Sequence, residues 1–196
     1  YWCKHATDNL MFFYVNKPSV VVGKHQNALA ESNFNYLREN QIPLLRRISG
    51  GGTVFHDLGN LNFSFHTQVD DPAKTVYRQF LEPVKRALQK MKIDAEISSR
   101  NDITVNGFKV TGHAAHVYKK RVLSHGTLLV SANTEQLSAA LKPSEGQFEG
   151  KAIASVRSKV SNIERFVNTQ IELNELIEAI KKEAEVSFGK GSFERF

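Results

Sequence analysis

The sequence of 196 residues contains one cysteine, Cys3, and lacks the long apolar run that a membrane-spanning helix requires. A single cysteine excludes an internal disulfide framework and a zinc site made of several cysteines. These absences favour a reducing, cytoplasmic setting and give no indication of a membrane partner. The sequence does not begin with Met, so a mitochondrial location after removal of a transit segment stays open.

Several catalytic signatures are also missing. The chain has no Gly-Lys-Ser/Thr ending of a P-loop, no His-Glu-x-x-His motif and no Gly-x-Ser-x-Gly nucleophile elbow. Cys3 is far in sequence from every cluster of polar residues, which leaves no good candidate for covalent acyl-cysteine chemistry. The groups that remain, a glycine loop with arginines, a lysine beside Asn101-Asp102 and a second cationic segment, suit a nucleotide and a carboxylate substrate.

The composition is that of one globular domain, which we expect to cover residues 1–196. Lys and Arg number 26 against 20 Asp and Glu, giving a formal net charge of +6. This excess favours acidic partners, which include nucleotides, nucleic acid and acidic protein surfaces. A basic nucleic-acid-binding domain is the distant alternative. It is disfavoured because no strand interleaves aromatic and basic residues as RNA-binding sheets do.

Apolar periodicity predicts strands in mid-chain with helices between them. The segment Asn60–His66 alternates cleanly, so we expect one face in the core and the other lining something polar. Asp71 and Pro72 predict the start of a helix that Pro83 kinks. The other predicted elements are strands at Leu10–Val15, Ser19–Gly23 and Leu123–Ser131 and helices at Ser32–Asn40, Thr134–Leu141 and Leu173–Val186. The sum is an α/β (α+β) fold with a central mixed, largely antiparallel sheet flanked by helices.

A hairpin is predicted around Asn106-Gly107, a dipeptide that favours a two-residue type I′ turn. This turn pairs Val105 with Phe108, Thr104 with Lys109 and Ile103 with Val110. Because cross-strand partners share a face, Lys109 and Asp102 are expected to lie on the same, polar side of the sheet. A solvated strand lysine remains the simpler interpretation of Lys109 from local sequence alone.

The most informative segment runs from Arg46 to Phe65, where two arginines precede Gly50-Gly51-Gly52. Consecutive backbone N–H groups in a glycine turn can bind an anion, and arginine offers a planar donor fork to carboxylate or phosphate. A second cationic segment, Ser155–Val160, could serve the same purpose. Glycine-rich and basic surface loops without a ligand are the alternative interpretations.

The chain resembles the lipoate–protein ligase family, within the biotin/lipoate ligase group. The resemblance spans nearly the whole sequence in order. It rests on motifs that include Arg46–Asn60, Arg100-Asn101-Asp102, Lys109–Ala114, His125–Leu129 and Ser155–Asn162. It implies an ATP- and Mg²⁺-dependent ligase that converts lipoate to lipoyl-AMP and then passes the lipoyl group to a lysine. The implied acceptors are lipoyl domains of 2-oxoacid dehydrogenase E2 subunits and the glycine cleavage H protein.

The resemblance also assigns roles to residues. Lys109 corresponds to the family's key lysine, and Asp102 is a metal ligand candidate. Ser155–Val160 corresponds to a loop that closes over the intermediate. The residues expected to bind lipoate or ATP are Arg47, Ser49, Gly51, Gly52, Thr53, Val54, Phe55, His56, Asn101, Asp102, Lys109, Gly112, Ala114, His125 and Arg157.

Two features depart from the family pattern. His113 stands where a small residue is expected, near the phosphate position. The chain ends at Phe196, where many ligases continue into a smaller accessory domain. We therefore expect a catalytic domain truncated at its N-terminus and lacking that accessory domain. The alternative activity is a lipoyltransferase that uses preformed lipoyl-AMP or another acyl donor.

Overall fold

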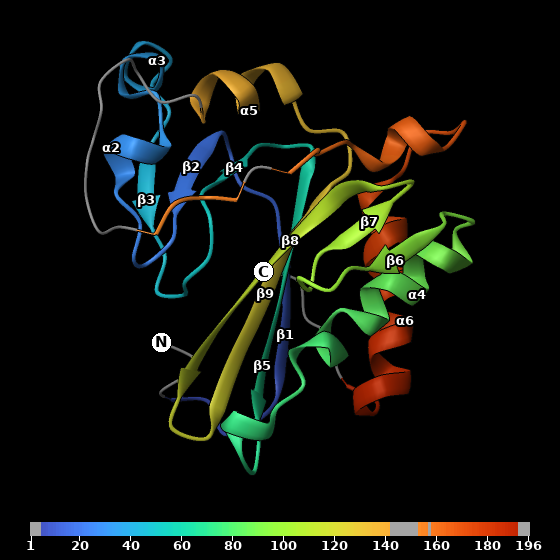
Figure 1. The fold of residues 1–196 in the computed structure, drawn as a ribbon. Helices are drawn as coiled ribbons and strands as arrows, with labels where there is room; N and C mark the ends of the chain where they lie inside the picture. Colours follow the sequence, from blue (N-terminus) through green and yellow to red (C-terminus); the bar gives the residue numbers. More distant parts are fainter. Residues whose placement is uncertain (1–4, 142–152, 157, 192–196) are drawn as a thin grey trace.

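A computed structural model describes residues 5–141, 153–156 and 158–191 (Figure 1). The strands are β1 (Leu10–Tyr14), β2 (Ser19–Val22), β3 (Leu44–Arg46), β4 (Val54–His56), β5 (Asn60–Gln68), β6 (Ala95–Ile97), β7 (Ile103–Val105), β8 (Phe108–Tyr118) and β9 (Arg121–Leu129). The helices are α2 (Ala28–Glu31), α3 (Phe34–Glu39), α4 (Glu82–Lys90), α5 (Thr134–Ala140) and α6 (Leu173–Phe188), with 3₁₀ turns η1 (Pro72–Lys74), η2 (Tyr77–Phe80) and η3 (Ile163–Phe166).

Six strands form an antiparallel sheet in the order β1-β5-β9-β8-β7-β6. Helices α4 and α6 cover one face of this sheet (Figure 1). The main core lies between them and includes Phe63 and Phe65 of β5, Leu88 of α4 and Ile180 of α6. Glu183 of α6, almost completely buried, forms ion pairs with Arg86 and Lys90 and so ties the two helices together.

A second, three-stranded sheet has the order β3-β2-β4, in which β2 pairs parallel with β3 and antiparallel with β4. It lies on the opposite side of the large sheet from α4 and α6, together with α2, α3 and α5 (Figure 1). Its own core contains Val20, Leu37, Phe55 and Ala140. The predicted fold class is confirmed, and the parallel pairing belongs to this small sheet.

Strand β5 explains how the site face arises. Leu61, Phe63 and Phe65 pack in the main core, as the alternation predicts. The residues between them face the small sheet, and all of Asn60, Asn62, Ser64 and His66 are buried. The polar face of β5 is therefore covered by a second layer of protein, which turns it into the floor of an interior site.

The hairpin of β7 and β8 turns at Asn106 and Gly107, whose φ angles of 49° and 77° match a type I′ turn. Val105 pairs with Phe108 and Thr104 with Lys109, as predicted. The third predicted pair is wrong, because a bulge between Ile103 and Thr104 pairs Ile103 with Thr111. Thr111 is consequently fully buried rather than on the polar side.

We expect Gly107→Ala to destabilise the domain by about 1–2 kcal/mol, since a Cβ disfavours this left-handed backbone. No atom lies within 4 Å of where that Cβ would be, so the cost is conformational rather than steric. Urea denaturation measures it. Gly50→Ala is the matched control, because Gly50 also has open space around its would-be Cβ but no positive φ. Equal stability of the two variants would contradict the expectation.

The helix predicted after Asp71 is interrupted. Asp71 does cap a turn, accepting a hydrogen bond from the Ala73 backbone N–H, but η1 ends at Lys74. After η2, helix α4 begins at Glu82, with Pro83 in its first turn. The predicted kink at Pro83 is wrong: proline lacks an N–H and is tolerated where the first helical N–H groups have no partner, so it starts the helix instead.

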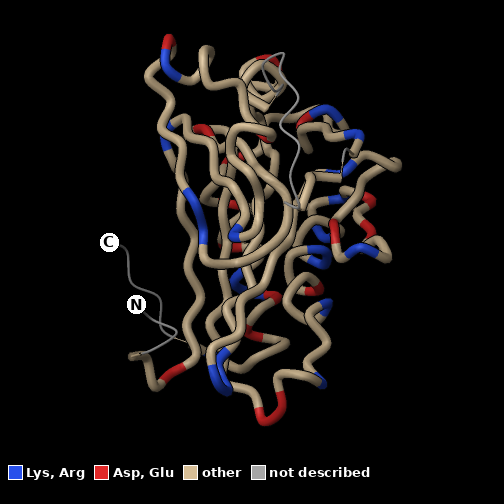
Figure 2. Tube along the Cα trace, turned by 60° about the vertical axis from the view of Figure 1, so that its left-hand side comes forward, with Lys and Arg blue, Asp and Glu red and all other residues tan. Residues whose placement is uncertain are grey.

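Basic and acidic residues are interspersed along the described trace rather than separated onto two faces (Figure 2).

Among the helices the structure describes, none combines the length and the apolar character needed to cross a bilayer.

Candidate functional site

The glycine-rich segment forms a loop that follows β3 and reaches over the floor of the large sheet. Arg47 shapes this loop, because its Nη2 atom donates to the carbonyl oxygens of Gly50 at 2.7 Å and Gly52 at 2.6 Å. Its Nη1 atom donates to the Val21 carbonyl at 3.1 Å. Burial lowers the pKa of the guanidinium. Arg47 therefore holds the loop while contributing a fixed positive charge to its surroundings.

Close packing requires glycine at two points of this loop. A Cβ on Gly23 would lie 2.1 Å from the Gly51 carbonyl oxygen, so the turn after β2 and the glycine loop touch through their backbones. Gly51 itself has a φ of +90°, which side chains disfavour. Substituting either glycine would displace the loop that carries Arg47 and Ser49.

Ser49 and His125 connect the loop to the sheet. The Ser49 Oγ atom lies 2.6 Å from His125 Nε2. Burial, followed by the charge of Arg47, lowers the pKa of His125 to about 4, so this imidazole is neutral at pH 7. His125 of β9 pairs with Ser64 of β5 and with Ala114 of β8. These side chains share the face that looks toward the glycine loop.

Lys109 and Asp102 form an ion pair, with Lys109 Nζ 2.9 Å from Asp102 Oδ1. The expectation that they face one side is thus confirmed. The Lys109 ammonium lies 3.9 Å from the position that a Cβ of Gly112 would take, so the absence of a side chain at Gly112 leaves room beside it. The Lys109 backbone is held as well, because its N–H donates to the Lys159 carbonyl and its carbonyl accepts from the Ser161 N–H.

A cavity of about 380 Å³, here called the Phe12 cavity, lies between the large sheet and the glycine loop. Its walls are mostly apolar, with a few polar groups at defined places. It is lined by Phe12, Phe13, Tyr14, Arg47, Ile48, Ser49, Ser64, His66, Leu123 and His125. Such a cavity suits an elongated apolar ligand with one polar end.

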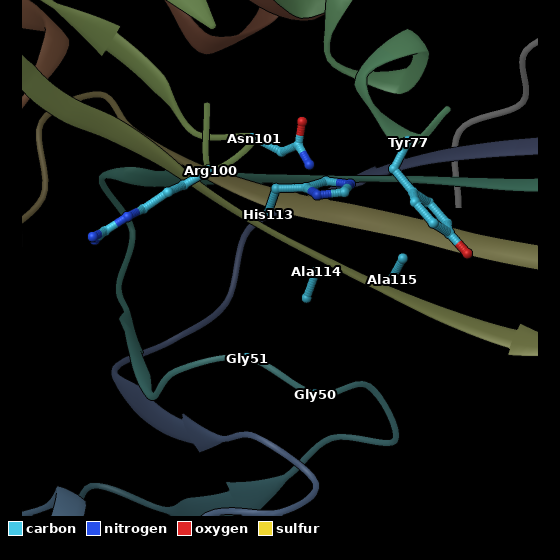
Figure 3. A pocket seen from close by; sticks show the side chains of 8 residues that line it. All are labelled: Gly50, Gly51, Tyr77, Arg100, Asn101, His113, Ala114 and Ala115. Atoms are coloured by element: carbon cyan, nitrogen blue, oxygen red, sulfur yellow. The ribbon is translucent and has the colours of Figure 1, made fainter. Parts of the chain in front are cut away.

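A second cavity of about 300 Å³, the Asn101 cavity, is also lined by the glycine loop (Figure 3). It is lined by Gly50, Gly51, Tyr77, Arg100, Asn101, His113, Ala114 and Ala115. Figure 3 shows His113 and Asn101 next to each other on one side of β8 and Ala114 pointing toward Gly50 and Gly51. His113 Nε2 lies 2.8 Å from Ser124 Oγ, and burial lowers the pKa of His113 to about 4. His113 thus lines the Asn101 cavity as a neutral imidazole, at a position where a small residue was expected.

The segment Thr53–His56 is largely committed to internal contacts. The Thr53 N–H donates to Ser155 Oγ, and the Thr53 hydroxyl donates to Gln26 Oε1. Phe55 packs in the core of the small sheet, its backbone pairs with Val20, and its carbonyl accepts from the Asn60 side chain. Val54, beside it in β4, is half-buried. Burial, with the charge of Arg47, lowers the pKa of His56 to about 4, and its Nε2 atom is buried without a partner.

Sequence reasoning named Ser155 only as part of the second cationic segment and did not single out Ser64, His66 or Tyr77 as ligand-binding residues. Ser155 Oγ accepts hydrogen bonds from the Thr53 N–H and the Gln26 side chain, and the Ser155 N–H donates to Glu31. Ser64 and His66 line the Phe12 cavity, on the face of β5 that the alternation predicted to line something polar. Tyr77 lines the Asn101 cavity, although it comes from a segment read as helix. Arg157, expected to bind the ligand, lies outside the described residues.

Within the described ranges, no group of three or more His, Cys, Asp or Glu side chains could hold a metal ion. Asp102 is therefore a single carboxylate beside Lys109, and any metal there would need ligands from a bound molecule.

Comparisons with known proteins agree with this architecture. The family model described as "Lipoyl protein ligase A/B catalytic domain" matches residues 2–185. The chain belongs to this family. It is 44% identical over 177 residues to lipoate-protein ligase LplJ of Bacillus subtilis, a match that covers 89% of this chain and 54% of that protein.

Two solved structures are similar in fold and sequence. One is lipoate-protein ligase A bound with ATP, at a TM-score of 0.79 and 29% identity, covering 93% of this chain and 73% of that one. The other is a bipartite lipoate protein ligase from Thermoplasma acidophilum, described with its E2 lipoyl domain. Its TM-score is 0.80 at 30% identity, covering 93% and 72%. The chain spans about half the length of the curated relatives it matches.

Proposed function

We propose that this domain joins lipoate to AMP and transfers the lipoyl group to a lysine of an acceptor lipoyl domain. Its relatives include a named lipoate-protein ligase, a structure with bound ATP and a structure described with a lipoyl domain. The observation that carries the proposal is the Lys109–Asp102 ion pair beside Gly112, together with two cavities that are both lined by the glycine loop.

The two cavities have different linings, and each suits a different substrate. The mostly apolar Phe12 cavity suits the lipoyl chain, with Arg47 and Ser49 at its roof. The Asn101 cavity is lined by the backbone of the glycine loop, by Arg100 and by the side-chain amide of Asn101, all of which can donate hydrogen bonds to phosphate oxygens. Asp102 follows Asn101 directly, and Gly112 lies beside the Lys109 ammonium. We therefore propose that Lys109 contacts both the carboxyl group of lipoate and the α-phosphate of ATP.

The proposed reaction has two steps. A lipoate carboxylate oxygen attacks the α-phosphorus of ATP, and the bond to pyrophosphate breaks. An acceptor amine then attacks the acyl carbon, the bond to AMP breaks, and the amine loses a proton. Neither step needs a nucleophile from the enzyme. Both develop negative charge on oxygen, which a preorganised ammonium stabilises.

A magnesium ion would fit as part of the nucleotide rather than as a resident of the protein. Mg²⁺ is commonly bound through one or two carboxylates together with substrate phosphates. Asp102 offers one such carboxylate, with its Oδ1 held by Lys109. When bound, the ion would neutralise phosphate charge.

The test is to measure the two half-reactions separately. With ATP, Mg²⁺ and lipoate, we expect lipoyl-AMP and pyrophosphate, detected by mass spectrometry. With preformed lipoyl-AMP and an apo lipoyl domain, we expect the mass of the acceptor to rise by one lipoyl group. Transfer without adenylation would identify the alternative, a lipoyltransferase. The absence of both reactions would refute the proposal.

A further inference from the structure

The Phe12 cavity lies on a ladder of side chains arranged in rows across four strands, of which β1, β5 and β9 contribute lining residues. One row contains Tyr14, Asn62, Thr127 and Gly112, and the next contains Phe12, Ser64, His125 and Ala114. A third row contains Leu10, His66, Leu123 and His116. All three rows face the glycine loop. Because the rise per residue of a strand is nearly constant, the spacing of these rows gives distances along the cavity.

Lys109 lies at the first-row end of the ladder. Its ammonium lies beside Gly112, in the first row. His66 is in the third row, four residues along β5 from Asn62, and a strand advances 3.2–3.4 Å per residue. The first and third rows are therefore about 13 Å apart along the strands. Gly112 and His66 also lie two strands apart, about 9.5 Å across the sheet, so about 16 Å separates the two positions. His66 and Leu123 are the residues of the third row that line the cavity.

This distance matches an eight-carbon acid. Seven carbon–carbon bonds of about 1.5 Å, laid out as a zigzag, span about 9 Å. Van der Waals contact at the methyl end adds about 4 Å, and the hydrogen bond from ammonium to carboxylate adds about 3 Å. An acid whose carboxylate binds the Lys109 ammonium thus brings its last carbon into contact with His66.

His66 is built as a rigid wall. Its ring is packed edge-on against the ring of Phe12, at a centroid separation of 5.3 Å and an interplanar angle of 86°. Its Nε2 atom lies 3.3 Å from Ser64 Oγ, and only 8% of the residue is exposed. The ring is therefore held on two sides. It would have to lose both contacts to make room for a longer chain.

We infer that His66 is the residue that sets the length of the acyl chain, by closing the cavity one eight-carbon length away from Lys109. The inference rests on the proposed function, since it assumes that the carboxyl group binds beside Lys109. It concerns specificity: acids longer than eight carbons are excluded by the imidazole.

The test is calorimetric titration of the protein with lipoate and with saturated acids of six, eight and ten carbons. Each buried methylene strengthens binding about fourfold. We expect the wild-type protein to bind the eight-carbon acid about 15-fold more tightly than the six-carbon acid and to bind the ten-carbon acid more weakly. In His66→Ala the preference should move to the ten-carbon acid, by about 15-fold over the eight-carbon acid.

Three further variants make the result specific. His66→Ser should behave like His66→Ala, which provides a second shortened side chain if one variant does not fold. His66→Leu keeps a wall of similar size and should keep the wild-type order. His116→Ala is the matched control, because His116 lies in the same row but does not line the cavity.

The outcomes separate the two proposals. An eight-carbon optimum that persists in folded His66→Ala and His66→Ser would overturn the inference while lipoate binding still supports the function. The same shift in His116→Ala would overturn it too. A wild-type protein that binds neither lipoate nor any of the acids would overturn the proposed function itself.

Discussion

Replacing Lys109 with alanine should lower the rates of lipoyl-AMP formation and of lipoyl transfer about 10²- to 10³-fold while leaving the domain folded. The expected loss follows from removing one preorganised donor at developing negative charge, which typically costs about 2.7–4 kcal/mol in the transition state. The effect on stability should be small. The Lys109 side chain is 27% exposed, and ion pairs with solvent access contribute about 0–1 kcal/mol.

Rates of both half-reactions and a urea unfolding curve check this expectation together. Lys17→Ala, a change of an exposed lysine in the turn between β1 and β2, is the control for a general loss of positive charge. Lys109→Arg should not restore activity, because a planar fork does not replace a compact ammonium in the space beside Gly112. Near-normal rates for Lys109→Ala would show that Lys109 is not the catalytic lysine.

Acidification should destabilise the domain strongly between pH 6.5 and about pH 4. Four histidines at or near the site, His56, His66, His113 and His125, have their pKa lowered to about 4. Burial is the main cause in each case. The charge of Arg47 contributes at His56 and His125, and that of Arg121 at His66. In the unfolded chain these side chains titrate near pH 6.5.

The sign follows from proton binding. Between pH 6.5 and 4 the unfolded chain holds protons that the folded chain does not, so stability is fully present above pH 6.5 and falls as pH decreases. Each histidine contributes up to about 1.4 kcal/mol per pH unit in this interval. Urea unfolding at a series of pH values measures the slope. His113→Asn should reduce this slope by the contribution of one proton. A flat profile from pH 7 to pH 5 would be inconsistent with four histidines that stay neutral in the folded protein.

The parts of the fold that depend on local chemistry could be predicted from the sequence. The alternation in Asn60–His66 placed Phe63 and Phe65 in the core, and Asn106-Gly107 fixed the turn that brings Lys109 to Asp102. The bulge at Ile103 could not be predicted, because the turn fixes only the pairs next to it, Val105 with Phe108 and Thr104 with Lys109. The break before Pro83 also escaped prediction, since proline is compatible with both a kinked helix and a helix start.

The site was predictable where a motif supplies the chemistry and unpredictable where distant strands supply the walls. The Phe12 cavity depends on the pairing of β1 with β5, a contact between segments about 50 residues apart that no local pattern reveals. The role of Arg47 in holding the loop carbonyls was not visible either. Arginine next to glycine indicates a donor fork, but the sequence does not say whether that fork faces a ligand or the backbone.

The segment that follows the undescribed residues 142–152 is fixed at two distant points of the site. Ser155 is bonded to the glycine loop, and the backbone on either side of Val160 is bonded to Lys109. The two anchors are five positions apart, and an extended chain of that length spans at most about 18 Å. The reach of this segment therefore limits how far the glycine loop can move away from Lys109 while both sets of hydrogen bonds remain.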